Sequence, residues 1–395
     1  MPRTILHLDL DAFFCAVEEN QNPSLRGKAF AVGGKPDERG VVASCSYAAR
    51  RNGVRSAMPM SKAIRLCPGL LIVSSRHSLY GEVSRQVMAI LREQTLLVEQ
   101  ISIDEAFLDI SNVPDEPEQF ARGLQGRIRD ELHLPCSIGI ASNKLIAKLA
   151  TEVGKAVALQ RIKTQGLVEP PNALTAVGFG EEAAFLDPLP VDMLWGVGPK
   201  TFARLTELGI RTIGDLAKWP ESELLRLFGE NGRDLARHSK GIDDRPIVTE
   251  HETKSISQEV TFSKDVRDDK VLEDTLREQS GEVARQLRRN NLAGKTIKLK
   301  IRWPDFTTVT RQTTLNDPTD QPHVIEKAAL DLLKSVRKPN QAVRLIGVGV
   351  SGLGEPVRQL GLWDLDSEKS RKLQEILDAL QEKYGKDVIK RGNMS

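Results

Sequence analysis

The chain has 395 residues, which is longer than one ordinary domain and predicts two to four domains. Hydrophobic residues make up 40% and charged residues 28%, as in soluble globular proteins, and no apolar run approaches the ~18 residues of a membrane span. The net charge is only +2, but eight Lys or Arg and one acid lie between Arg285 and Arg311, which predicts a basic surface for a polyanionic partner. The N-terminal residues lack the features of a signal peptide, which favours a cytoplasmic location.

The four cysteines are scattered along the chain, and none has the spacing of metal ligands. We expect reduced, partly buried thiols, and the six dispersed histidines give no reason to assign a His/Cys metal site.

The first 166 residues alternate between strand-like and helix-like patterns. The predicted elements are a strand over 4–10, a mixed segment to about Arg76, a helix over 80–93, strand-like sequence over 99–110, a helix over 120–132, a strand over 136–141, and a helix over 143–153 with Ser142 as its N-cap. This order indicates an α+β sheet with helices on one face.

The pattern changes after Gly166. Proline-rich segments at 169–171 and 187–190 frame a boundary, and short helices follow over 191–240. A linker is predicted near 241–246, then a second α+β unit over 255–350, and finally a helix over 368–384.

Two acidic segments are the first candidate site. Asp9 and Asp11 end the first strand, and Asp104 and Glu105 lie within the apolar segment 101–107. Gathered carboxylates repel one another, and a hard divalent cation such as Mg²⁺ removes that cost. In a straight strand Asp104 and Glu105 would point to opposite faces, so both can serve one site only if a turn or bulge lies there. Ordinary surface acids at strand ends would show the same spacing.

Four motifs together resemble the Y family of DNA polymerases, the lesion-bypass polymerases. They are His7–Phe14, Val41–Arg50, Ser102–Phe107 and Cys136–Lys144, in the order and spacing of the family. The resemblance covers about residues 4–365. It implies a multidomain α+β protein with a ferredoxin-like palm (1–12 and 77–166), fingers (13–76), a helical thumb with a helix-hairpin-helix (167–240), a linker (241–247), an α+β little finger (248–354), a clamp-binding peptide (355–366) and a C-terminal helical tail (367–395).

The same resemblance implies roles for individual residues. Asp9, Asp104 and Glu105 would be catalytic and bind two Mg²⁺ ions, with Mn²⁺ as a substitute and the carbonyl of Leu10 as a further ligand. The implied nucleotide-binding residues are Phe13, Phe14, Ser44, Tyr47, Arg50 and Lys155. Phe14 would be the steric gate against a ribose 2′-hydroxyl. The chain departs from the family pattern at Ala48 and at 156–158, which follow Tyr47 and Lys155.

Two regions are predicted to bind the DNA backbone. The segment 194–201 resembles a helix-hairpin-helix, in which Gly196, Gly198 and Lys200 would let a phosphate approach a helix N-terminus. In the second α+β unit, alternation places Ile297, Leu299, Ile301 and Trp303 inward and the cations outward. The candidate DNA contacts there are Arg285, Arg288, Arg289, Lys298, Lys300 and Arg302. A glycine-rich helix connection and a solvated charged face are the plainer alternatives.

The segment 355–365 contains a glutamine and large apolar anchors, as in peptides that bind the sliding clamp. The candidate anchors are Gln359, Leu360, Leu362 and Trp363.

The implied activity is template-directed addition of dNTPs to a primer 3′-hydroxyl, at low fidelity and without proofreading, by a monomer that binds primer–template DNA, dNTPs and the clamp. Three alternatives remain open: a nucleotide cyclase with a similar palm, a non-catalytic DNA-binding relative, and a mutasome-type subunit that needs partner proteins.

Overall fold

The computed structural model describes residues 3–356, 376 and 380, and divides the chain into two compact units, 1–251 and 252–395. No helix in the described part of the chain is long and apolar enough to cross a bilayer. Each unit has its own buried core.

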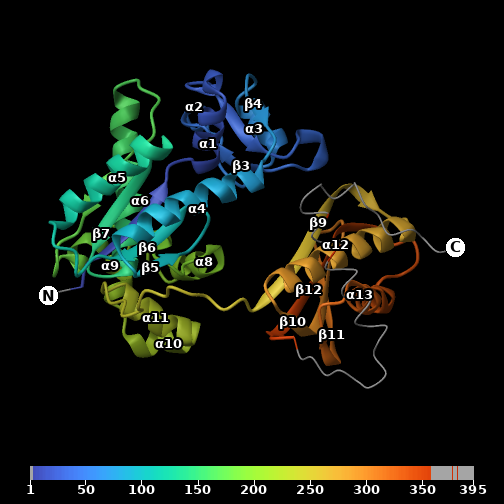
Figure 1. Cartoon of the computed structure of the whole chain (residues 1–395). Coiled ribbons are helices and arrows are strands. Elements are labelled where there is room, and N and C mark those ends of the chain that lie inside the picture. The colour runs from blue at the N-terminus through green and yellow to red at the C-terminus, as the bar shows by residue number, and fades with distance from the viewer. Residues whose placement is uncertain (1–2, 357–375, 377–379, 381–395) are drawn as a thin grey trace. The chain divides into compact units, whose positions relative to one another are not determined.

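The first unit is built on a five-stranded sheet in the order β5-β6-β1-β7-β8 (Figure 1). The central strand β1 pairs antiparallel with both neighbours, and β7 pairs parallel with β8. The strands are β1 (Ile5–Leu10), β5 (Val98–Gln100), β6 (Glu105–Asp109), β7 (Cys136–Ala141) and β8 (Leu174–Ala176).

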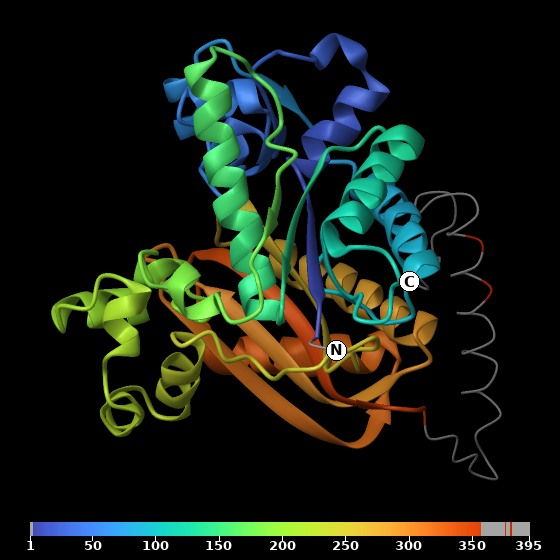
Figure 2. The same cartoon turned by 90° about the vertical axis from the view of Figure 1, so that its left-hand side faces the viewer.

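Helices cover both faces of this sheet, so the prediction of helices on one face is wrong. Alternation in β1 directs Leu6, Leu8 and Leu10 towards one face, where they pack with α1 (Phe13–Gln21), α4 (His77–Gln94) and α5 (Pro117–Leu132). Ile5 points the opposite way and packs with α6 (Lys144–Thr164), which runs alongside β1 in Figure 2.

Helix α6 is longer than predicted, and its cap differs. The side chain of Asn143 is the N-cap and accepts a hydrogen bond from the backbone N–H of Ile146 at 3.0 Å. The predicted cap, Ser142, instead donates to Glu182 at 2.5 Å. The extra length matters because the last turns of α6 carry Lys155.

A small three-stranded sheet with a separate core follows α1. Its elements are η1 (Pro23–Leu25), β2 (Phe30–Gly33), η2 (Pro36–Glu38), β3 (Val42–Cys45), α2 (Tyr47–Arg51), α3 (Met60–Leu66) and β4 (Leu71–Val73).

Short helices occupy 182–238, so the predicted run over 191–240 is present but begins earlier, with a helix over 182–186. They are α7 (Glu182–Leu186), η3 (Val191–Met193), α8 (Pro199–Glu207), α9 (Ile213–Ala217), α10 (Glu221–Phe228) and α11 (Glu230–His238). After them the chain follows an extended path that is tied to the first unit. Asp243 accepts from the backbone N–H of Leu145 at the start of α6, and Glu99 accepts from the backbone N–H of Val248.

The second unit is a four-stranded antiparallel sheet in the order β11-β10-β12-β9. Its elements are β9 (Ser255–Val266), α12 (Asp269–Arg289), β10 (Ala293–Arg302), β11 (Thr308–Thr319), α13 (Pro322–Val336) and β12 (Val343–Gly354). Helices α12 and α13 pack on one face (Figure 2), over the inward-facing Ile297, Leu299 and Ile301. The predicted alternation of β10 is therefore confirmed.

All four cysteines are buried and unpaired, as expected. Burial raises the pKa of Cys15 to about 12 and also raises the pKa values of Cys45 and Cys136.

Candidate active site

The acidic site forms where β1 and β6 lie side by side. Asp9 is paired directly with Glu105 across the antiparallel ladder, so both side chains point to the α6 face of the sheet. A carboxylate from α6, Glu152, joins them, and oxygens of the three residues lie within 4.8 Å of one another. This is a donor set that suits a hard divalent cation.

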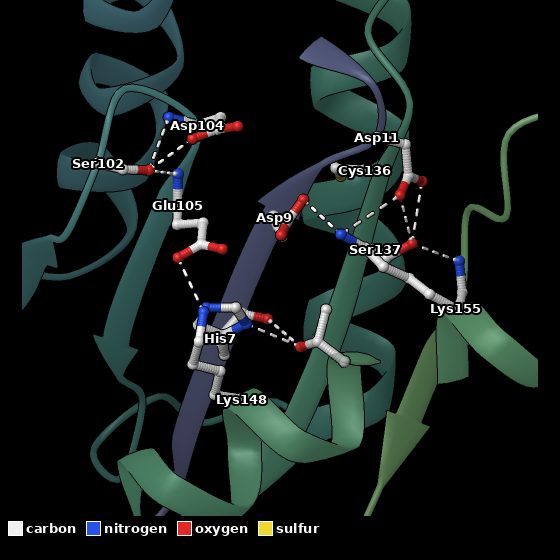
Figure 3. A network of polar contacts seen from close by, with 12 residues as sticks. His7, Asp9, Asp11, Ser102, Asp104, Glu105, Cys136, Ser137, Lys148 and Lys155 are labelled. Carbon is white, nitrogen blue, oxygen red and sulfur yellow. Dashed lines mark hydrogen bonds and ion pairs between the residues drawn. The ribbon is translucent and has the colours of Figure 1, made fainter. Parts of the chain in front are cut away.

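Asp104 lies beside this group but not in it. Residues 101–104 form the hairpin turn between β5 and β6, in which the N–H groups of Ile101 and Ser102 donate to the carbonyl of Glu105. The turn that the two adjacent acids would need to serve one site is therefore present. The carboxylate of Asp104 accepts a hydrogen bond of 2.5 Å from Ser102 (Figure 3). The carbonyl of Asp104 accepts one of 3.0 Å from the N–H of Leu10.

Lysines of α6 form ion pairs with acidic side chains of the sheet. Lys155 lies 2.5 Å from Asp9, and Lys148 lies 2.9 Å from Glu105. A third lysine, Lys144, is buried against Glu99 at 2.9 Å. These three lysines of α6 therefore face the sheet and its acids.

The pKa of Asp9 is raised to about 7. Burial is the main cause, and Lys155 opposes it, while the nearby carboxylate of Glu105 adds to it. Burial opposes the ammonium of Lys155 as well, but Asp9 and Asp11 outweigh that effect and raise its pKa. The site thus contains more negative charge than its environment favours, which a bound cation would relieve.

Asp11 is held by hydrogen bonds from neighbouring segments of the chain. It accepts hydrogen bonds of 2.9 Å from the hydroxyl of Ser137 and 2.9 Å from the backbone N–H of Asn172, and Lys155 lies 3.8 Å away (Figure 3). Asp11 therefore ties the end of β1 to β7 and to the segment before β8.

His7 lies next to the site on β1 and is fully buried. Its Nδ1 is 2.9 Å from the hydroxyl of Thr151, and its ring packs against Phe107 with centroids 4.8 Å apart. Burial lowers the pKa of His7, and Lys148 and Lys155 lower it further, so the ring is neutral at neutral pH.

The nucleotide-binding candidates lie around the end of β1 and on α2. Phe13 is buried in the core, whereas Phe14 is half-buried and stacks on Tyr80 with ring centroids 4.2 Å apart. Tyr80 is fixed in turn by a 2.5 Å hydrogen bond to the buried Glu18. The ring of Phe14 therefore packs on an aromatic side chain that is itself held by a hydrogen bond.

Ser44 is buried in β3, while Tyr47 and Arg50 lie on α2 with the guanidinium 5.1 Å from the ring centroid. Tyr47 also lines a small cavity that contains Asp11. Burial and the negative charge of Asp11 raise the pKa of the Tyr47 hydroxyl, which stays protonated and can donate a hydrogen bond.

The predicted DNA contacts do not all lie on one surface. Gly196 and Gly198 are exposed before α8, where Gly196 has a φ of +99° and Gly198 is the N-cap. In the second unit, Lys298, Lys300 and Arg302 lie on the sheet face opposite the helices. The other three candidates, Arg285, Arg288 and Arg289, are carried by α12 on the helical side.

The clamp-binding candidates Gln359, Leu360, Leu362 and Trp363 lie outside the described residues. Sequence reasoning missed Glu152 and Ser102. Glu152 lies four residues after Lys148 and three before Lys155, so helical spacing alone could have placed it with them.

Comparisons with known proteins agree with this geometry. Residues 8–152 match the impB/mucB/samB family, and 253–362 match the C-terminal domain of that family. The chain is 39% identical to the DNA polymerase IV of Desulfatibacillum aliphaticivorans, covering 98% of this chain and 95% of that protein. It is 43% identical to the DNA polymerase IV of Streptomyces coelicolor, covering 89% of this chain and 71% of that protein.

A solved Y-family DNA polymerase chimera has the same fold. Its TM-score is 0.77 at 26% sequence identity, covering 89% of this chain and 99% of the chimera. The chain belongs to the Y family of DNA polymerases. Membership places it among the DNA-directed DNA polymerases that act in translesion synthesis, and the relatives are of the bacterial polymerase IV type that its motifs most resemble.

Proposed function

We propose that this chain adds dNTPs to a primer 3′-hydroxyl by two-metal phosphoryl transfer, at low fidelity and without proofreading, in translesion synthesis and DNA repair. The observation that carries the proposal is the pairing of Asp9 with Glu105 across β1 and β6, with Glu152 in reach of both. A carboxylate group of this kind at a strand end, flanked by lysines, suits phosphoryl transfer.

The donor set fits Mg²⁺, with Mn²⁺ as a substitute, because it consists of carboxylate oxygens, and burial raises the pKa of Asp9, which a bound cation would counter. Asp9, Asp104 and Glu105 would hold two ions, and the carbonyl of Leu10 would be a further ligand. When bound, such ions make the 3′-hydroxyl a better nucleophile and neutralise charge on the leaving pyrophosphate.

The chain's own side chains would orient the triphosphate. Tyr47 and Arg50 would donate hydrogen bonds to its oxygens from α2, and Ser44 would lie next to them. Lys155, which is paired with Asp9, would exchange that carboxylate for a phosphate oxygen. Phe14, supported by Tyr80, would lie against the sugar and exclude a 2′-hydroxyl, with Phe13 packed beneath it.

The open face of the second unit would follow the DNA backbone. Gly347 and Gly349 of β12 pair with Lys300 and Lys298 of β10, and the side chain of Lys300 forms an ion pair of 2.6 Å with Glu259 of β9. A phosphate of the backbone would compete with Glu259 for Lys300, whereas Lys298 is exposed. Gly196, Gly198 and Lys200 would contact a phosphate from the first unit.

The proposed organisation follows the family: palm (1–12 and 77–166), fingers (13–76), thumb (167–240), linker (241–247), little finger (248–354), clamp-binding peptide (355–366) and tail (367–395). The proposed partners are primer–template DNA, dNTPs and the sliding clamp, and the chain would act as a monomer in the cytoplasm.

Primer extension on an undamaged template with Mg²⁺ tests the function. We expect extension by wild type, and a loss of about 100-fold or more in Asp9→Asn, Glu105→Gln and Asp104→Ala. Glu152→Gln is the matched comparison for Asp104→Ala. The two variants together show whether Asp104 or Glu152 is the third acid needed as a metal ligand. Activity should survive in Glu152→Gln.

Other outcomes would change the proposal. No extension by wild type would favour a partner-dependent subunit or a non-catalytic relative. Full activity in Asp104→Ala with loss in Glu152→Gln would move the metal site onto α6. Thermal unfolding of each variant excludes a loss of fold as the cause.

A further inference from the structure

A basic cavity of about 450 Å³ lies between α2 and the C-terminal half of α6. Arg50, Arg51, Arg55 and Lys163 line it, and Glu169 is the one acid in its wall. Liquid water occupies about 30 Å³ per molecule, so the cavity has room for a small polyanion together with hydrating water.

Backbone carbonyls hold the arginines of this cavity. Arg50 Nε donates to the carbonyl of Cys45 at 3.2 Å, and Arg51 Nη1 donates to that of Gly166 at 3.1 Å. Arg55 Nη1 donates to the carbonyl of Arg50 at 2.6 Å.

Within the part of the chain that the structure describes, none of the cavity's four cations forms an ion pair with a carboxylate. The guanidinium groups are therefore positioned while their charge stays uncompensated. An anion that enters can accept several charge-assisted hydrogen bonds without displacing a carboxylate.

The cavity adjoins the proposed triphosphate site through two shared residues. Tyr47 and Arg50, which would contact the triphosphate, also line the cavity. Tyr47 additionally lines the smaller cavity that contains Asp11. A phosphate leaving the carboxylates can therefore stay in contact with Arg50 while it reaches Arg51, Arg55 and Lys163.

A solvated basic surface is the plainer explanation for four cations. It does not account for the hollow between α2 and α6, whose wall on the α6 side includes the apolar Leu159 and Ile162. It also does not account for arginines whose positions are fixed by backbone carbonyls.

We propose that this cavity is a binding site for inorganic pyrophosphate, made by Arg51, Arg55 and Lys163 together with the shared Arg50. The proposal rests on the proposed function. There, the primer 3′-hydroxyl gives its proton to solvent water while its oxygen forms a bond to the α-phosphorus. The bond between that phosphorus and the bridging oxygen breaks, and pyrophosphate leaves with the bonding electrons. The cavity receives this leaving group and, in the reverse reaction, supplies it.

The test uses the full chain and two double variants. Arg55→Gln with Lys163→Gln removes two cavity charges that the triphosphate site does not share. Lys62→Gln with Arg65→Gln is the matched control, because both residues are exposed on α3 and neither lines the cavity.

Two measurements apply to each protein. The first is calorimetric binding of pyrophosphate to the protein in EDTA, without DNA. The second compares the KM for pyrophosphate in pyrophosphorolysis with the KM for dNTP in single-nucleotide extension.

We expect the cavity variant to bind pyrophosphate about tenfold more weakly, and its KM for pyrophosphate to rise similarly, as when charge-assisted hydrogen bonds are lost. Its KM for dNTP should stay at the wild-type value, and the control should match wild type throughout.

Three results would overturn the proposal. Unchanged pyrophosphate binding in the cavity variant would leave a solvated surface. A parallel rise in the KM for dNTP would make the cavity part of the triphosphate site. Weaker primer–template binding with unchanged pyrophosphate binding would assign it to a DNA phosphate. Failure of the proposed function would give a different result, because wild type would then not extend a primer at all. Pyrophosphate binding in EDTA needs no catalysis and can still be measured in that case.

Discussion

Phe14 illustrates how a residue's role depends on its support. Its ring is half-buried and stacks on Tyr80, whose hydroxyl is bonded to the buried Glu18, so the ring has little freedom to move aside. We expect Phe14→Ala to admit ribonucleotides, because the space taken by the ring opens to a 2′-hydroxyl. The measurement is the ratio of kcat/KM for rNTP to that for dNTP.

Phe14→Tyr is the control, since it retains the ring and should retain the discrimination. An unchanged ratio in Phe14→Ala would remove the steric-gate assignment. Phe13→Ala is unsuitable as a control, because a buried Phe costs about 3–5 kcal/mol when truncated.

His7 makes the folded state sensitive to acid. Its pKa lies well below its ordinary 6.5, because burial and two lysines disfavour the imidazolium. Just below the ordinary pKa, the imidazole of His7 therefore binds a proton in the unfolded chain but not in the folded chain. The contribution of the neutral ring is fully present above the ordinary pKa, and it falls as the pH drops below that value.

We expect His7→Asn to lose less stability than wild type between about pH 7 and pH 5, with a difference of up to about 1.4 kcal/mol per pH unit. Urea unfolding in metal-free buffer measures it. Parallel curves for the two proteins would show that His7 does not titrate in this range.

Residue motifs predicted much of the acidic site, but not all of it. Asp9 and Glu105 are brought together as the motifs imply. Whether Asp104 would point with them could not be predicted, since alternation does not show where a hairpin turns, and in the structure it binds Ser102. Glu152 lies within the predicted helix but belongs to none of the motifs, and the structure shows that it reaches Asp9 and Glu105, which the pairing of β1 with β6 brings together.

At the scale of elements, the close approach of α6 to β7 determines where the lysines lie. A Cβ on Gly139 would lie 2.0 Å from the carbonyl of Ala147 and 2.6 Å from the N–H of Thr151. We expect Gly139→Ala to displace α6 and to lower the stability of the first unit by about 1–3 kcal/mol. Primer extension should fall as well, because Lys155, which would bind the triphosphate, moves with the helix.

Gly123→Ala on α5 is the matched control. Its added Cβ would meet no atom within 4 Å, so alanine should raise stability by up to about 1 kcal/mol. Thermal unfolding of both variants measures the effect. If Gly139→Ala were as stable and active as wild type, the contact between α6 and β7 would not be what places the lysines.

The sequence predicted the helices and strands better than it predicted which face of a sheet each helix covers. The period of two correctly separated the two faces of β1, both of which are buried, and the buried from the more exposed side chains of β10. The faces that helices cover depend on contacts between distant segments, so the position of α6 opposite α4 and α5 could not be read from local pattern. For the same reason the six predicted DNA-binding cations of the second unit divide between two faces.

At the scale of the whole molecule, two units with separate cores are joined by one chain connection. If the second unit follows the phosphate backbone with its open face, DNA affinity must depend strongly on salt. We expect Lys298→Gln to reduce the slope of log K against log salt by about 1, with little change in sequence preference.

Lys334→Gln is the control for that measurement, because Lys334 is exposed on α13 at the helical side of the sheet. Fluorescence anisotropy of a labelled primer–template at several salt concentrations gives both slopes. Equal slopes for wild type and Lys298→Gln would remove the open face from the DNA interface.

The burial of the four cysteines has a practical consequence. Thiolates, not thiols, react with alkylating reagents, and the raised pKa values of Cys15, Cys45 and Cys136 leave almost no thiolate at neutral pH. A cysteine introduced on the exposed surface of each unit would therefore react first. A pair of fluorophores could be attached to the otherwise natural chain, and energy transfer between them would report how far apart the two units lie with and without DNA.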